Sequence, residues 1–222
     1  MSNNITDIEL QSLHSYNIDV KNREIFLHSY IGESEIDPGT DYRSAIFFEK
    51  NMRYLNLLSN EPILIHMHMP GGDWEDCMGI FDTIRFSKAK TIMLAYGKLQ
   101  SASGIIFQAP TYRILMPNVN MLIHYGSISL DGEHSKAAAS NLKWNELECD
   151  KMVDIFVERC MQGSLAKTKN WKKMMAKKHI ESQLANKCDW ILNANEAVEY
   201  GFADGILGEK KFLTIDHLKK LK

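Results

Sequence analysis

The chain has 222 residues, of which 45% are hydrophobic and 24% are charged. A chain of this size and composition forms one large or two small globular domains with a sizeable core. The 26 basic and 28 acidic residues give a formal net charge of −2, which provides no drive toward nucleic acid or an anionic membrane. The apolar runs fall far short of the ~20 residues that span a bilayer, and from the polar N-terminal residues we expect neither a secretory signal nor an organellar presequence. We therefore expect a soluble, cytoplasmic protein.

The cysteines and histidines do not form a recognisable metal motif. The cysteines are Cys77, Cys149, Cys160 and Cys188. Their scattered positions argue against a zinc ribbon or a disulfide scaffold and fit a reducing compartment. His66 and His68 alternate on a predicted strand, a spacing that would suit a metal, but a third ligand is not apparent. We expect structural roles for both histidines, and no metal.

The first 67 residues begin an alternation of strands and helices. Residues 1–20 are predicted to form a polar N-terminal arm with a few apolar anchors. A strand is expected at 23–28, followed by a loop at 32–40 that contains a Pro-Gly pair. Apolar residues at three- and four-residue steps predict an amphipathic helix over 42–58. The apolar run at 63–67 is bounded by turn residues, so it predicts a buried strand.

The alternation continues through the middle of the chain. A second helical pattern lies at about 78–85, and another buried strand is expected at 91–96. The small-residue turn 101–104 opens an apolar helix, and further strands are predicted at 113–118 and 120–124. Buried strands that alternate with helices are typical of a mainly parallel α/β sheet.

The last third is predicted to be mostly helical. A polar hinge at 126–132 leads to a long helix over about 136–160 with an apolar stripe. A short helix at 195–201 ends on glycine. The basic tail, 208–222, is expected to be peripheral.

A lysine-rich run lies between these helices, at 166–178. Its lysines recur at three- and four-residue steps, which predicts a solvated helix face with Trp171 and Met175 packed inward. Binding of an acidic partner or nucleic acid is the alternative interpretation.

Three side chains in this pattern can carry chemistry. Ser101 lies at the start of the apolar helix, where free backbone N–H groups can stabilise an oxyanion; it is a candidate nucleophile if a base reaches it, or an ordinary N-cap. His124 closes a strand and is a candidate general base, or a partly buried histidine bonded to backbone. Asp189 alone is equally consistent with a capping or solvated residue. The glycines Gly71 and Gly72 alone are explained by a tight turn.

Taken together and in order, these features resemble the Clp peptidase family (ClpP), serine proteases of the crotonase-like superfold. The resemblance extends from about Arg23 to Leu207. Its most specific segments are Pro70–Gly72 with Gly79–Phe86, Gly97–Ser101, Leu115–Asn118 with Met121–His124, and Asp189 with Ala194–Gly201.

The resemblance implies a role for each candidate residue. Ser101 falls on the nucleophile, His124 on the general base and Asp189 on the acid that orients the imidazole. The backbone amides of Gly72 and Ala102 fall on the oxyanion hole. The residues expected to contact substrate are Gly71, Asp73, Trp74, Tyr125 and Gly126. This chemistry needs no metal or organic cofactor.

The acidic and aromatic run at 73–76 is expected to lie near the bound substrate. It leads to the hypothesis that basic or aromatic substrate side chains are favoured. Ser103, two residues after Ser101, is a competing nucleophile.

The resemblance also implies an organisation. It divides the chain into an arm at 1–20, a peptidase domain at 21–207 and a basic tail at 208–222. The domain contains a handle helix at about 136–160 and a lysine-rich insertion at about 164–182. The implied assembly is a heptameric ring, one of a stacked pair joined by the handle helices, and an AAA+ unfoldase of the Clp type feeds polypeptide substrates into it.

Other readings stay open at this point. Cys188 stands where the family usually has a basic residue used in ring–ring contacts, and Tyr125 and Gly126 replace the usual Gln-Pro. The alternatives are a catalytically silent ring subunit, an acyl-CoA enzyme of the same superfold, and a specialised processing protease, for example a phage-encoded one.

Overall fold

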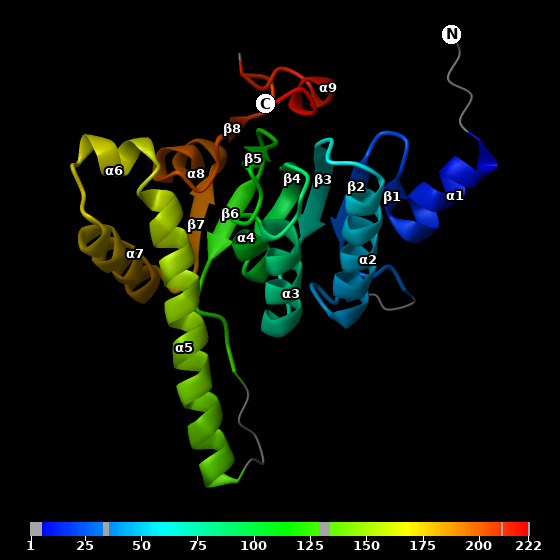
Figure 1. Cartoon of the computed structure of the whole chain (residues 1–222). Helices are drawn as coiled ribbons and strands as arrows, with labels where there is room; N and C mark the ends of the chain where they lie inside the picture. Colours follow the sequence, from blue (N-terminus) through cyan, green and yellow to red (C-terminus); the bar gives the residue numbers. More distant parts are fainter. Residues whose placement is uncertain (1–5, 33–35, 129–133, 210, 222) are drawn as a thin grey trace.

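The computed structural model describes residues 6–32, 36–128, 134–209 and 211–221. Within them, eight strands form one mainly parallel sheet, with most helices packed against one of its faces (Figure 1). The predicted α/β class is confirmed. Along the main path the strands are β1 (Ile18–Asp19), β2 (Glu24–His28), β3 (Ile63–Met69), β4 (Thr91–Gln100), β5 (Tyr112–Leu115) and β8 (Gly205–Ile206).

Strand β4 changes partner along its length. Its first half pairs with β5, and its second half pairs in parallel with β6 (Asn120–Ile123). Strand β7 (Trp190–Asn193) then runs antiparallel to β6. The sequence predicted that β4 ends at Tyr96, because glycine often ends a strand; instead Gly97 adopts φ +40° and the strand continues to Gln100. The sheet therefore has a second branch, and this branch carries the candidate site.

The helices between residues 42 and 160 lie close to their predicted positions. Helix α2 begins at a capping box between Asp41 and Ser44, which satisfies the first free amides of the helix. The helices are α1 (Asp7–Tyr16), α2 (Tyr42–Leu58), α3 (Trp74–Arg85), α4 (Ala102–Ile106), α5 (Ser135–Cys160), α6 (Ser164–Thr168), α7 (Lys173–Lys187), α8 (Ala194–Tyr200) and α9 (Ile215–Leu218).

The two faces of the sheet pack against different partners. Successive side chains of a strand point to opposite faces, so Ile63 and Ile65 join the core beneath the helices. Leu64 lies in a second, smaller cluster together with Phe212 and Leu218.

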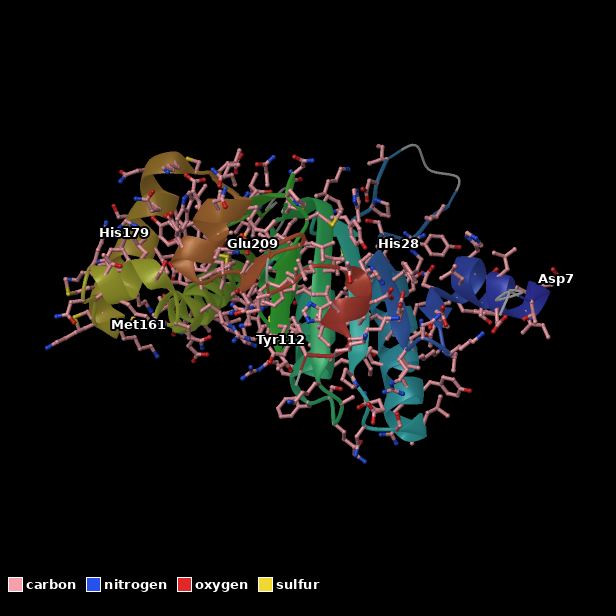
Figure 2. All side chains as sticks on the ribbon, turned by 90° about the horizontal axis from the view of Figure 1, so that it is seen from above. Asp7, His28, Tyr112, Met161, His179 and Glu209 are labelled. Atoms are coloured by element: carbon pink, nitrogen blue, oxygen red, sulfur yellow. The ribbon has the colours of Figure 1, made fainter. Side chains whose placement is uncertain are left out.

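The C-terminal segment is thus part of the core rather than a peripheral tail. Phe212 and Leu218 are 1% and 0% exposed, and Figure 2 shows this segment lying across the strands. The expectation of a peripheral tail was wrong because it followed the basic residues of this segment. Two apolar side chains among them, Phe212 and Leu218, pack against the sheet. Within the predicted tail, residues 210 and 222 lie outside the described part of the chain.

The lysine-rich run is broken rather than continuous. Helix α6 ends at Thr168, Asn170 adopts φ 48°, and α7 begins at Lys173. Trp171 packs against the core as predicted, whereas Met175 is 51% exposed. The prediction for Met175 was wrong because the break changes which positions of α7 face inward.

The predicted N-terminal arm contains regular structure. Helix α1 has no buried residue among those described, and β1 adds an antiparallel strand to the edge of the sheet at β2. Residues 1–5 of the arm, 33–35 of the predicted loop and 129–132 of the predicted hinge lie outside the described residues. No helix in the described ranges is long and apolar enough to cross a bilayer.

Candidate active site

The second branch of the sheet brings Ser101, His124 and Asp189 to one place. Ser101 directly follows β4 and His124 directly follows β6, and these two strands are parallel neighbours. Asp189 directly precedes β7, which is antiparallel to β6 with Trp190 opposite Ile123. The ends of three adjacent strands therefore meet, although the residues are up to 88 positions apart in sequence.

The three side chains form a hydrogen-bonded series. His124 Nε2 lies 2.7 Å from Ser101 Oγ, and His124 Nδ1 lies 3.2 Å from Asp189 Oδ1. An ionised carboxylate only accepts hydrogen bonds, so Nδ1–H donates to Asp189. In the neutral ring Nε2 is then free to accept from the Ser101 hydroxyl, which is the arrangement that a general base needs.

Ser101 has an unusual backbone conformation. Its φ of 54° and ψ of −127° are rare for a residue with a side chain. Its backbone N–H donates to Leu122 O at 2.9 Å, which ties the turn to β6. The side chain makes no capping bond to α4, so the interpretation of Ser101 as an ordinary N-cap was wrong. The geometry is that of a sharp turn between strand and helix that presents its serine.

Ser103, the competing candidate, is engaged elsewhere. It is fully buried, and its Oγ lies 2.8 Å from Met69 O and 2.6 Å from Gln100 O. Its hydroxyl ties the end of β3 to the turn, and the histidine is bonded to Ser101 instead.

Two neighbouring glycines allow close backbone packing, one against Ser101 and the other against Thr40. Gly71 has φ +104°, and a Cβ there would lie 2.7 Å from Ser101 Cβ. Gly72 has φ +148°, and a Cβ there would lie 2.3 Å from Thr40 O. The hydrogen bonds recorded for the described chain use neither the Gly72 nor the Ala102 amide, so both can donate to a ligand.

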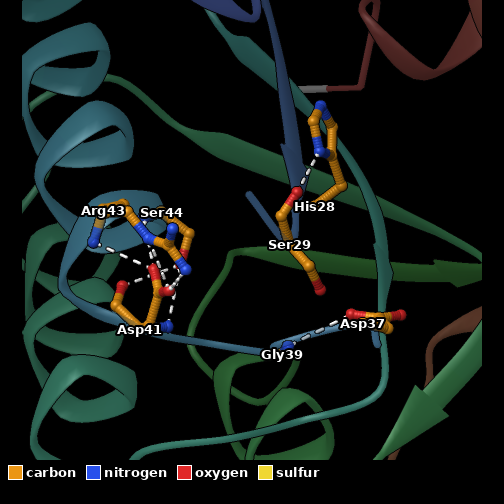
Figure 3. Close-up of polar contacts among 7 residues, drawn as sticks. All are labelled: His28, Ser29, Asp37, Gly39, Asp41, Arg43 and Ser44. Carbon is orange, nitrogen blue, oxygen red and sulfur yellow. Dashed lines mark hydrogen bonds and ion pairs between the residues drawn. The ribbon is translucent and has the colours of Figure 1, made fainter. Parts of the chain in front are cut away.

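A segment that the sequence did not single out supports these glycines from behind. Thr40 N donates to Gly71 O at 2.5 Å, and Asp73 N donates to Thr40 O at 2.8 Å. Figure 3 shows how this segment is fixed on both sides: Asp37 accepts from Gly39 N, and Asp41 caps α2. The available signal was the Pro-Gly turn followed by a capping aspartate, which fixes the chain but does not indicate what it touches.

A cavity of about 400 Å³ adjoins Ser101. Most of the predicted site residues line it: Gly72, Asp73, Trp74, Ser101, Ala102, His124, Tyr125 and Gly126. Gly71 is not in the lining and packs against Ser101 instead. Asp189 contacts the imidazole nitrogen that points away from Ser101, and its side chain is 62% exposed.

One wall of the cavity was missed by the sequence reasoning. It comes from α5, and its residues are Asn145, Glu148, Cys149 and Met152. Their steps of three, one and three residues place them on one face of a helix. This spacing was the available signal, but nothing in it identifies the site that the face covers.

The cavity has an acidic character. Burial raises the pKa of the Glu148 carboxyl, and the negative charges of Glu75 and Asp73 raise it further. A hydrogen bond from Trp144 lowers this pKa but does not cancel the increase. Burial also raises the pKa of the Cys149 thiol, with Glu148 adding to the effect. In the described part of the chain, His124 is the only basic side chain in the lining.

A hydrogen-bonded Ser-His-Asp series beside two unbonded amides, built on an α/β sheet, is an arrangement typical of serine hydrolases. The family model described as Clp protease matches residues 11–210. The chain belongs to the Clp protease family and is a serine-type endopeptidase, a proteolytic subunit of the Clp type. The acyl-CoA alternative is thereby set aside.

Individual relatives agree with this assignment. The chain is 29% identical to "ATP-dependent Clp protease proteolytic subunit 2" of Pseudomonas aeruginosa, over 80% of this chain and 81% of the relative. It is 31% identical to the protein of the same name from Treponema denticola, over 73% and 76%. Among solved structures, a point mutant of ClpP1 from Listeria monocytogenes matches with a TM-score of 0.67 and 20% identity, over 90% of this chain and 96% of that one.

Proposed function

We propose that Ser101 is the nucleophile of peptide-bond hydrolysis, with His124 as general base and Asp189 as the residue that orients the imidazole. Ser101 Oγ attacks the scissile carbonyl as His124 Nε2 takes its proton. The imidazolium then gives this proton to the departing amine. A water molecule, activated by the same histidine, releases the acyl group from the serine. The observation that carries the proposal is the 2.7 Å contact between Ser101 Oγ and His124 Nε2.

The amides of Gly72 and Ala102 form the oxyanion hole in this proposal. Gly72 and Ala102 line the same cavity as Ser101, and their amides are unbonded in the described chain. A donor of this kind contributes roughly 3–4 kcal/mol to transition-state stabilisation. The substrate lies in the cavity against Asp73, Trp74, Tyr125 and Gly126. Gly71, which the resemblance also assigned to substrate contact, lies outside the cavity lining and supports the turn at Ser101.

The working form is a cytoplasmic oligomer, a heptameric ring that stacks on a second ring through α5. Two observations support this arrangement. Helix α5 extends beyond the body of the protein (Figure 1), and its Leu142, Trp144 and Leu147 are about half exposed or more. Apolar side chains gathered on an extended helix are typical of a contact surface.

An AAA+ unfoldase supplies unfolded polypeptide in this proposal. The names of the relatives describe an ATP-dependent protease, whereas this chain has no G-x-x-x-x-G-K-[ST] phosphate-binding loop. ATP would therefore be used by a partner.

Hydrolysis of a loosely folded protein such as casein by the assembled protein tests the proposal. We expect cleavage by the unaltered chain and its loss in Ser101→Ala, with the oligomeric state unchanged. Equal cleavage by Ser101→Ala would overturn the assignment of the nucleophile. A folded oligomer that cleaves neither casein nor short peptides would instead favour the silent-subunit alternative.

A further inference from the structure

Two elements place carboxylates around the cavity beside Ser101. Asp73 and Glu75 come from the start of α3, and Glu148 comes from α5. They are close enough for the charges of Glu75 and Asp73 to act on Glu148. Lysine and arginine are absent from the lining in the described chain, so these carboxylates have no fixed counter-ion within the cavity.

The remainder of the cavity is suited to a long hydrocarbon stem. Ile105 and Met152 are 3% and 4% exposed and line it from α4 and α5, and Trp74 adds an aromatic ring. Lysine and arginine bury their methylene groups on apolar surface while their charged ends reach polar groups. A cation near an indole gains a further attraction from the ring.

We propose that this cavity selects substrates with a lysine or arginine side chain beside the cut bond, with Glu148 as the principal carboxylate that receives the cation. The inference rests on the proposed function, because it assumes that Ser101 carries out the cut. It goes beyond the preference suggested by residues 73–76, because the receiving residue lies on α5 and the preference is specifically for a cation. Asp73 and Glu75 line the same cavity and add to its negative charge.

Two peptidyl diphenyl phosphonates test the proposal, one with lysine and one with norleucine at the position beside the phosphonate. The two reagents have side chains of similar length, and only lysine carries a charge. Both react with an activated serine, so the rate of mass gain at Ser101 reports the preference directly. A generic fluorophosphonate, which lacks a peptide side chain, reports the reactivity of the serine independently.

We expect the lysine reagent to react faster with the unaltered protein, and Glu148→Gln to reduce its advantage by roughly five- to tenfold. Glu158→Gln is the matched control, because it removes the same charge from α5 at an exposed position outside this cavity. The advantage should also shrink as salt is raised, since charge pairs open to solvent are screened.

The two claims can fail separately. Equal or faster reaction of the norleucine reagent with the unaltered protein would overturn the cation preference and leave the nucleophile in place. An unchanged lysine advantage in Glu148→Gln would overturn the assignment of Glu148 as the receiving carboxylate. Failure of all three reagents on the assembled protein would overturn the proposed function and the inference with it.

Discussion

Thr40 and Gly72 form a parallel backbone bridge directly behind the turn that faces Ser101. Thr40 donates to the carbonyl of Gly71 and accepts from the amide of Asp73. The bridge holds Gly72 from both sides, so the amide assigned to the oxyanion hole is positioned by a segment more than 30 residues earlier in the chain. Preorganised donors of this kind stabilise a transition state without reorganising during the reaction.

Gly39→Ala should disturb this support. A Cβ at Gly39 would lie 2.0 Å from Gly71 O, and the residue has φ +72°, so the carbonyl must move and the turn with it. We expect kcat/KM for peptides to fall about tenfold or more, as for a misplaced oxyanion donor. Gly208→Ala is the control, because Gly208 has φ +100° but nothing within 4 Å. Equal losses of activity in both variants would argue against a specific role for the bridge.

His124 and Asp189 should differ in their effect on rate. His124→Ala removes the base and is expected to lower kcat by about 10⁶-fold, whereas Asp189→Asn removes only the orienting carboxylate and should cost about 10⁴-fold. The 3.2 Å bond and the 62% exposure of Asp189 place it on the solvent side of the imidazole. Steady-state kinetics on a short fluorogenic peptide measures both. A larger loss for Asp189→Asn than for His124→Ala would contradict these roles.

Glu24 should support the fold at neutral pH and less in acid. It accepts from His66 Nε2 at 3.0 Å and pairs with Lys219. Burial pushes the pKa of Glu24 up, but the hydrogen bonds from His66 and Lys219 outweigh it, and the pKa ends below the ordinary 4.5. A lowered carboxyl pKa stabilises the fold fully above about pH 4.5, and this contribution is lost as the pH falls through the lowered pKa.

Glu24→Gln should therefore reduce the free energy of unfolding by about 1–3 kcal/mol at pH 7, with a smaller difference near pH 3. Urea denaturation at both pH values measures this, with the exposed Glu61→Gln as control. A difference that is constant or that grows in acid would contradict the sign of the pKa shift.

The C-terminal segment should contribute measurably to stability. Phe212→Ala removes a side chain that is 1% exposed, and such a truncation costs about 3–5 kcal/mol. Its neighbour Leu213 is 56% exposed, so Leu213→Ala is expected to have little effect. Thermal denaturation of the two variants compares them directly. Similar melting temperatures would mean that the segment does not hold the sheet face in solution.

Much of the fold could be predicted from the chain because local pattern and burial agree. The apolar run at 63–67 and the three- and four-residue steps of 42–58 match β3 and α2. The resemblance to the Clp peptidase family implied that Ser101, His124 and Asp189 lie together, and the structure shows this proximity. Their catalytic roles stay a proposal.

The remainder depended on contacts that no local pattern encodes. Glu148 lines the cavity only because α5 passes over α4, and Thr40 touches Gly72 only because of the path of one loop. The burial of Phe212 depends on the free face of a sheet built from distant strands. Sequence position alone does not provide these relationships.

Labelling with a fluorophosphonate serine probe, followed by intact mass analysis, is the most direct test of Ser101 as the nucleophile. We expect a single adduct on the assembled protein, which disappears in Ser101→Ala and persists in Ser103→Ala, because the Ser101 hydroxyl contacts the His124 imidazole whereas the Ser103 hydroxyl is bonded to backbone. An adduct that persists in Ser101→Ala, or that disappears only in Ser103→Ala, would contradict this assignment.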